Sequence, residues 1–403
     1  LPVTALAAEN DKPSSLYVGN TNVAGTPYPD KAAYWTSNDG GTTWKSQTDK
    51  PTADSYIHYD GNGTLTLNGA TIKGDNSATG VPYGAGIYAR CNNGKSVALT
   101  IELIGTNTIT GNYGIYVDAQ QGETVGTNAS LLIRNSSDNG ILEVSGSNHG
   151  IFVISGTGKA SLTINDASVV AKTTQTYSGN AGVYVQSSSE ANSPQLSLIV
   201  NGGSLTASGG GNNDGIQFYV GASEATNATT SLIVTDNAIV DAKNGGISAK
   251  QVSNPINTDI SATGTSGGIV FDGKNGIVYG NVTLQEDITI GEGESLTIGV
   301  PSSTDDNGNT DSYLVAKLKY KQISGGQTGP TVVPLNSNYG DEGITWIENG
   351  CVRLAFHHYG DGGNGIFKDA ASVKLKKDQT IKVTFKLKDG VITWSQIPKC
   401  ALI

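Results

Sequence analysis

The sequence contains no methionine, few charged residues and no long hydrophobic run. Asp, Glu, Lys and Arg make up 15% of its 403 residues, whereas an ordinary globular domain carries about 25%. No apolar run approaches the ~18 residues of a membrane-spanning helix, so we expect no transmembrane segment. The net charge of −10 argues against a nucleic-acid partner, because phosphate binding needs a basic surface.

Cysteine is also scarce. The three cysteines, Cys91, Cys351 and Cys400, form neither a C-x-x-C pair nor a disulfide framework. A bond between Cys351 and Cys400 stays open, because the sequence does not give their distance. The adjacent His357 and His358 point to opposite sides of a predicted strand and do not share a metal there. We expect no metal site and no cofactor.

Glycine, in contrast, is abundant. Its 54 residues are about 13% of the chain, against a usual ~7%, and they lack the G-X-Y period of collagen. Charge is uneven: residues 1–311 hold 13 Lys and Arg against 28 Asp and Glu, a net of −15, and residues 312–403 hold 12 against 7, a net of +5. This asymmetry indicates a separate C-terminal unit.

The first nine residues read L-P-V-T-A-L-A-A-E. Small residues at Ala5 and Ala7 ahead of Ala8 and Glu9 are typical of the cleavage region of a secretory signal peptide. We therefore expect a secreted or cell-surface protein.

A repeat organises the middle of the chain. An N-x-G-apolar motif recurs five times, at spacings of 36, 32, 33 and 31 residues, and two further short apolar runs accompany each copy in phase. Three short strands per repeat, with Gly and Asn at the corners, predict one coil of a parallel β-helix. We expect an all-β protein, with a right-handed parallel β-helix over residues 56–300, an N-terminal β cap over 1–55 and a mainly β unit over 301–403.

The asparagine of each motif is predicted to be structural. Coils stack about 4.8 Å apart, so that equivalent residues form a row along the axis. Asparagine tolerates the left-handed conformation and bonds nearby backbone or the next asparagine, while the following glycine avoids a Cβ clash. The predicted row comprises Asn112, Asn148, Asn180, Asn213 and Asn244.

Alternation along the strand after each motif predicts which side chains face the core. The residues one and three positions after the glycine are apolar in every coil, and we expect them to point inward. They are Ile87, Ile115, Ile151, Val183, Ile216 and Ile247, and Ala89, Val117, Val153, Val185, Phe218 and Ala249.

The residues between them form an outward row that is aromatic in four successive coils. This aromatic row comprises Tyr88, Tyr116, Phe152 and Tyr184. If exposed, it is a platform on which sugar rings stack, and neighbouring Asp118 and Gln186 would orient hydroxyls. Two alternatives stay open: the rings only stabilise the sheet, or they lie beneath a terminal segment. A second outer row is also largely apolar: Thr100, Leu132, Thr163, Ile199 and Ile233.

The array over residues 56–300 resembles the pectin-lyase-like right-handed β-helix superfamily. The segment 64–69, T-L-T-L-N-G, and the N-x-G-I coils are similar to secreted bacterial carbohydrate-binding and adhesin-like surface proteins. The superfamily includes lyases, hydrolases and non-catalytic binders. Its lyases carry clustered acidic residues on adjacent coils, but the corresponding outward positions here hold one carboxylate: Arg90, Asp118, Ile154, Gln186, Tyr219 and Lys250.

Two further motifs predict turns. Residues 37–44 read S-N-D-G-G-T-T-W and resemble the Asp-box of sialidases, which is a folding motif, so we expect a hairpin near the N-terminal cap. Asp389 and Gly390 predict a second hairpin near the C-terminus.

The sequence therefore favours a non-catalytic protein that binds polysaccharide or a cell-surface glycan, or mediates adhesion, through the outer face of the β-helix. We assign no catalytic residue. Two alternatives remain: a polysaccharide lyase or glycoside hydrolase with a divergent site, and a structural spacer.

Overall fold

The computed structural model of this chain is almost entirely β. It describes residues 11–24, 32–75, 82–91, 94–120, 127–136, 140–188, 191–263 and 266–280, and beyond these mainly the backbone of short strands. Within the described residues the one helical element is a 3-10 turn, η1 (Pro82–Gly84), and no helix there has the length and apolar character needed to cross a bilayer. The predicted all-β class is confirmed.

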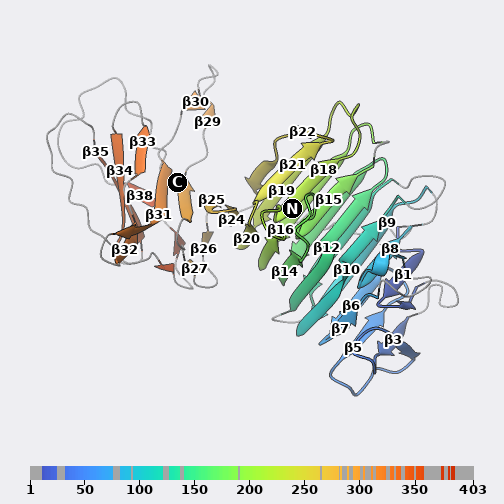
Figure 1. The fold of residues 1–403 in the computed structure, drawn as a ribbon. Helices are drawn as coiled ribbons and strands as arrows, with labels where there is room; N and C mark the ends of the chain where they lie inside the picture. Colours follow the sequence, from blue (N-terminus) through green and yellow to red (C-terminus); the bar gives the residue numbers. More distant parts are fainter. Residues whose placement is uncertain are drawn as a thin grey trace. The chain divides into compact units, whose positions relative to one another are not determined.

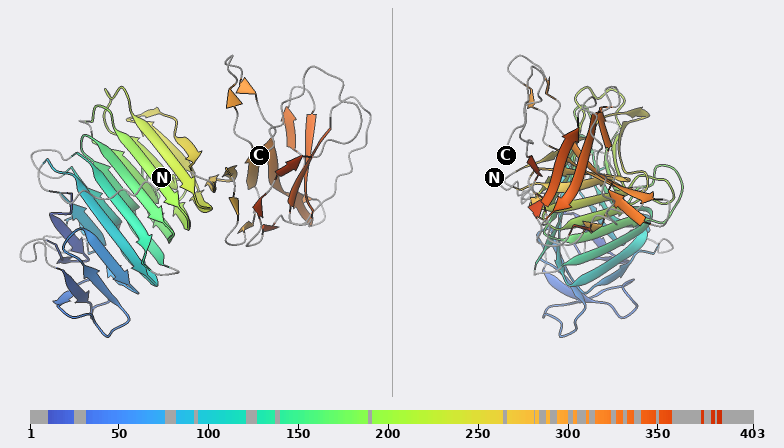
Figure 2. Two further views of the ribbon diagram at one scale, coloured as in Figure 1. Left: turned by 180° about the vertical axis from the view of Figure 1, so that it is seen from behind. Right: turned by 90° about the vertical axis from the view of Figure 1, so that its left-hand side faces the viewer.

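The chain divides into two compact units, residues 1–261 and 262–403. In the first unit, parallel strands stack side by side into three ladders (Figure 1; Figure 2 gives the view from behind). Ladder 1 contains β6 (Thr64–Asn68), β9 (Val97–Ile104), β11 (Ala129–Asn135), β13 (Lys159–Asn165), β16 (Gln195–Asn201) and β19 (Thr229–Thr235).

Two long strands turn a corner and contribute to both remaining ladders. Ladder 2 contains β7 (Thr71–Lys73), the first parts of β10 (Thr106–Asp118) and β12 (Ile141–Ser155), β14 (Ser168–Thr173), β17 (Ser204–Ser208) and β20 (Ala238–Lys243). Ladder 3 contains β8 (Ile87–Arg90), the second parts of β10 and β12, β15 (Val183–Ser187), β18 (Ile216–Val220) and β21 (Ile247–Gln251).

The register of the paired strands shows that this stack is the predicted parallel β-helix. In ladder 1, Leu131 pairs with Leu99 on one side and Leu162 on the other, so residues of the same type repeat along the axis. The right-handed winding inferred from the sequence stays a prediction.

The core lies between the ladders, and alternation assigned its members correctly. Of the twelve residues predicted to point inward in ladder 3, eleven are buried, and Ile247, in the last coil, is half-buried. Ladder 1 adds a stack of buried leucines: Leu99, Leu131, Leu162, Leu198 and Leu232. Burial of these apolar side chains is the main favourable contribution to the stability of the coils.

Short antiparallel strands close the ends of the ladders. At the N-terminal end, β5 (Tyr56–Tyr59) pairs with β6, and β3 (Ala33–Thr36) pairs with both β5 and β4 (Lys45–Gln47). β1 (Ser15–Val18), itself paired with β2 (Thr21–Asn22), covers the edge of β8, and β22 (Asn254–Pro255) covers β21. The N-terminal β cap is thus confirmed, and it blocks edges that would otherwise invite aggregation.

The Asp-box forms the predicted hairpin turn between β3 and β4. The Asp39 carboxylate accepts hydrogen bonds from the backbone N–H groups of Thr42 and Thr43 and from the Ser37 hydroxyl, at 2.8–3.1 Å. The Thr43 hydroxyl also donates to this carboxylate. These bonds, led by that from the Thr43 hydroxyl, lower the pKa of Asp39 because they favour the charged carboxylate.

β23 (Asp259–Ala262) lies next to β19 in the same sheet. The second unit begins with an antiparallel pair, β24 (Gly268–Asp272) and β25 (Asn275–Tyr279), followed by β28 (Ser295–Gly299) and β31 (Val315–Ile323). Its other strands are β26 (Val282–Thr283), β27 (Ile288–Thr289), β29 (Ser303–Thr304), β30 (Thr310–Asp311), β32 (Gln327–Pro330), β33 (Val333–Asn336), β34 (Asp341–Glu348), β35 (Cys351–His357), β36 (Lys374–Leu375), β37 (Thr380–Ile381) and β38 (Val383–Phe385).

The mainly β character of the C-terminal unit is confirmed. The Cys351–Cys400 bond, the side chains of His357 and His358, and the hairpin turn at Asp389 lie outside the described residues. The predicted boundaries at residues 55/56 and 300/301 stay predictions.

Candidate binding surface: the aromatic cluster

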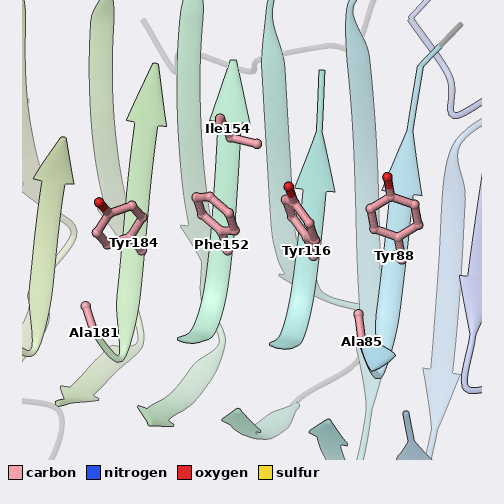
Figure 3. Packing of buried hydrophobic residues seen from close by; sticks show 7 residues of the cluster. All are labelled: Ala85, Tyr88, Tyr116, Phe152, Ile154, Ala181 and Tyr184. Atoms are coloured by element: carbon pink, nitrogen blue, oxygen red, sulfur yellow. The ribbon is translucent and has the colours of Figure 1, made fainter. Parts of the chain in front are cut away.

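The four rings of the aromatic row lie side by side on the outer side of ladder 3 (Figure 3). They come from β8, β10, β12 and β15, whose registers place Tyr88 beside Tyr116, Tyr116 beside Phe152, and Phe152 beside Tyr184. The ring centroids of successive members are 5.2, 4.7 and 5.3 Å apart, within the range of favourable aromatic pairs. The row exists as predicted.

The sequence left open whether this row is exposed, and in the structure it is buried. Tyr88 is 0% exposed, Tyr116 and Phe152 are each 7% exposed, and Tyr184 is 9% exposed. The faces of these rings are therefore not open for a sugar to stack on. Glycan binding by the row itself stays a prediction, whereas the alternative of a stabilising ladder agrees with the burial.

A second set of rings packs over this row. Tyr113 lies 5.0 Å from Tyr116 and 5.7 Å from Phe152, and Tyr83 lies 5.4 Å from Tyr116, measured between ring centroids. His149 stacks on Tyr184 at 4.4 Å with an interplanar angle of 21°. We call the two sets together the aromatic cluster: Tyr83, Tyr88, Tyr113, Tyr116, His149, Phe152 and Tyr184.

The sequence contained a signal for two of these additional rings. Tyr113 and His149 each occupy the position before the motif glycine, and the register pairs them directly. The alternation argument began after the glycine, so it missed them. Tyr83, in contrast, lies in η1, outside the repeat pattern.

The polar residues predicted beside the row do not form an open subsite. Asp118 is 0% exposed; it accepts a hydrogen bond from the Tyr88 hydroxyl at 3.0 Å and one from the Gln120 N–H at 2.8 Å. Burial, and then the charge of Asp118, raise the pKa of Tyr88. Gln186 is half-buried. Asp118 therefore holds the buried end of the cluster together, because it satisfies a tyrosine hydroxyl that lies away from water.

His149 is a neutral member of the cluster. It is 8% exposed, and its Nδ1 accepts a hydrogen bond from the Ala181 N–H at 3.1 Å. Burial lowers its pKa to about 4, because desolvation disfavours the charged imidazolium.

The asparagine row also lies where the repeat predicted, at the corner between ladders 2 and 3. Three of its amides bond to neighbouring groups: Asn213 donates to the Tyr177 carbonyl at 2.7 Å, Asn244 donates to the Gly209 carbonyl, and Asn112 accepts from the Ser147 hydroxyl. Of the row, Asn244 alone has a positive φ, +61°. The bonds of Asn213 and Asn244 to backbone carbonyls agree with the structural role and with the first of the two expected kinds of bond, that to nearby backbone.

The aromatic cluster reaches solvent at Tyr83, which is 45% exposed. This residue has a φ of +62°, a left-handed conformation that is uncommon for a bulky side chain. Tyr17, Tyr113 and Tyr219 pack around the buried rings and are partly buried.

In the part of the chain that the structure describes, no three His, Cys, Asp or Glu side chains are grouped so as to hold a metal ion. Cys91 is buried and unbonded. Burial and then the charge of Asp118 raise its pKa, which keeps the thiol protonated and unreactive.

Comparison with protein-family models, with curated proteins and with solved structures found no match.

Proposed function

We propose that this chain is a non-catalytic, secreted or cell-surface protein that binds polysaccharide or mediates adhesion through the outer face of its β-helix. The observation that carries the proposal is Tyr83, the exposed member of the aromatic cluster, whose ring packs against the buried rings of Tyr88 and Tyr116. A ring that packs on Tyr88 and Tyr116 loses little freedom when a sugar stacks on it, which lowers the cost of binding. We therefore propose Tyr83, and not the buried aromatic row, as the residue that contacts the glycan.

A structural role is the second candidate, and the burial of the aromatic row favours it. Four rings in register beneath a second set of rings stabilise adjacent coils whether or not a ligand binds. The two candidates make different predictions for Tyr83.

The test measures binding of the full chain to soluble neutral and uronate polysaccharides by affinity electrophoresis. One stacked ring contributes about 1 kcal/mol, so Tyr83→Ala should weaken binding about fivefold, from a parent Kd in the high-micromolar to millimolar range. Tyr83→Phe should bind like the parent chain. The matched control is Tyr177→Ala, because Tyr177 is 73% exposed and lies outside the aromatic cluster.

Equal retardation of the parent and Tyr83→Ala would contradict the role of this ring, and no retardation of the parent would favour the structural candidate. If the protein releases unsaturated or reducing sugar ends from these polysaccharides, and the activity depends on one Asp or Glu, the hypothesis of a non-catalytic protein is wrong.

A further inference from the structure

The aromatic cluster borders the corner between ladders 2 and 3, where β10 and β12 turn without a loop. A Cβ on Gly111 would lie 2.7 Å from the Gly84 oxygen and from the Gly86 nitrogen. The η1 turn, which carries Tyr83, therefore packs directly against the corner of β10. The Tyr83 ring also meets the Tyr113 ring edge to face, with the ring centroids 6.3 Å apart and an interplanar angle of 84°. The exposed ring thus lies beside this corner.

The corner of β12 contains a β-bulge. The register of β10 with β12 shifts here by one residue, so that Ser147 and Asn148 stand opposite Asn112 alone. A bulge of this kind leaves one residue unpaired and redirects its side chain. The Ser147 hydroxyl donates to the side-chain oxygen of Asn112, which leaves Asn148 as the extra residue. Asn148 is half-buried, and its amide makes no hydrogen bond within the part of the chain that the structure describes.

The Asn148 amide differs in this respect from two other amides of the asparagine row. Asn213 donates to the carbonyl of Tyr177, in the preceding coil. Asn244 donates in the same way to the carbonyl of Gly209. Those two amides therefore hold neighbouring coils together, whereas the Asn148 amide keeps two donors and an acceptor for a ligand.

The surroundings of Asn148 carry no charge. The three segments that form this corner contain no Asp, Glu, Lys or Arg: residues 82–89, 110–117 and 144–154. His149 is neutral above about pH 4, because burial lowers its pKa. The exposed charges of Lys73, Glu143 and Lys172 lie on the strands of ladder 2, before the corner. The corner therefore offers a ligand aromatic, hydroxyl and amide groups without an ionic partner.

We propose that the glycan bound at Tyr83 is uncharged and that Asn148 hydrogen-bonds its hydroxyl groups. This inference rests on the proposed function. A ring beside a few polar groups that fix the orientation of the ligand is the usual composition of a small-molecule site. Asn148 lies two coils beyond Tyr83, about 10 Å along the axis, which about two sugar rings span. An acidic glycan would gain no cation at this corner and would be repelled by the net charge of −10.

The test is frontal affinity chromatography of the full chain at pH 7. The columns carry galactomannan or β-glucan, which are neutral, or polygalacturonate, which is acidic. A neutral column should retain the parent more strongly than polygalacturonate does, and about 0.5 M NaCl should leave that retention unchanged, because no charge takes part.

Asn148→Ala should weaken binding to the neutral polymer about fivefold, because hydrogen bonds to the sugar are lost. Its urea midpoint should equal that of the parent, since the amide bonds no other group of the described chain. The matched control is Asn213→Ala, whose amide bonds the backbone. This control should unfold at lower urea and keep the Kd of the parent.

Circular dichroism checks that each variant is folded, and Asn148→Ser replaces Asn148→Ala if that variant does not fold. If Tyr83→Ala weakens binding and Asn148→Ala does not, this inference is wrong while the proposed function stands. Stronger retention on polygalacturonate that is lost in Lys172→Gln or in about 0.5 M NaCl shows an acidic ligand and also overturns the inference. If no column retains the parent, the proposed function fails together with it.

Discussion

Several buried polar side chains in this protein bond to backbone groups of adjacent coils. Asn107 is 0% exposed; its Oδ1 accepts from the Ala70 N–H at 2.8 Å, and its Nδ2 donates to the Ile104 and Gly105 carbonyls. The next coil has Leu142 at the same position. An amide replaces the leucine here because backbone groups at this corner would otherwise remain unpaired away from water.

At the scale of the single residue, His149 makes the stability of the protein depend on pH. Its pKa is about 4 in the folded chain against an ordinary value of 6.5. As the pH falls from 6.5 to 4, the unfolded chain takes up a proton that the folded chain does not, so the free energy of unfolding decreases by up to about 3 kcal/mol and then levels off. Urea unfolding between pH 4 and 7 should measure this slope.

His149→Asn keeps an acceptor near the Nδ1 position but does not titrate, so the slope of this variant should be flatter than that of the parent. His58→Asn is the control, because His58 is only half-buried, and it should change the slope less. Parallel pH profiles for the parent and His149→Asn would contradict the assignment.

At the scale of the element, close packing rather than an unusual φ requires the motif glycines of the first four copies, whereas Gly246, in the last copy, has a φ of +76°. A Cβ on Gly182 would lie 2.5 Å from the Ser208 nitrogen and 2.6 Å from the Ala171 oxygen, so the corner between ladders 2 and 3 leaves no room for a side chain. Gly179, nearby in the chain, has a φ of +92° but nothing within 4 Å of its Cβ position.

These two glycines provide a matched test. Gly182→Ala should lower the free energy of unfolding by about 3 kcal/mol or more, because backbone atoms of two coils must move apart. Gly179→Ala should cost only about 1 kcal/mol of conformational strain. Urea unfolding followed by circular dichroism measures both, and a larger loss for Gly179→Ala would show that φ governs these corners after all.

At the scale of the whole molecule, the stability of a stacked repeat is the sum of the stability of each coil and of the contacts between neighbouring coils. Leu162 has a leucine partner on both sides of its stack, while Leu232 has one, Leu198. Both leucines are 0% exposed, so they differ mainly in their place along the axis.

Leu162→Ala should lower the free energy of global unfolding by about 2–5 kcal/mol. Leu232→Ala should lower it less and should instead speed amide hydrogen exchange in β19 and β20, because an outer coil opens without the rest. Urea unfolding and hydrogen exchange together measure the difference; equal global losses would mean that the coils unfold as one cooperative block.

Much of this architecture was predictable, because each coil needs the same types of residue at the same positions. Period-two alternation after each motif glycine identified eleven buried residues. The short apolar runs that recur in phase with the motif predicted stacked equivalent strands, and Leu131 indeed pairs with Leu99 and Leu162. The Asp-box turn was also predictable, since its hydrogen bonds lie within eight consecutive residues.

The sequence by itself determined the all-β class, the parallel coils and the side of the strand on which Tyr88, Tyr116, Phe152 and Tyr184 lie, because these follow from spacing along the chain. Only the tertiary structure decided that this outer side is buried. Alternation assigns a side chain to one face of a sheet, but whether that face meets water depends on segments distant in sequence. Here Tyr83, from a 3-10 turn outside the repeat, and His149, from the corner of β12, pack over neighbouring rings, and alternation along the strand does not predict these contacts.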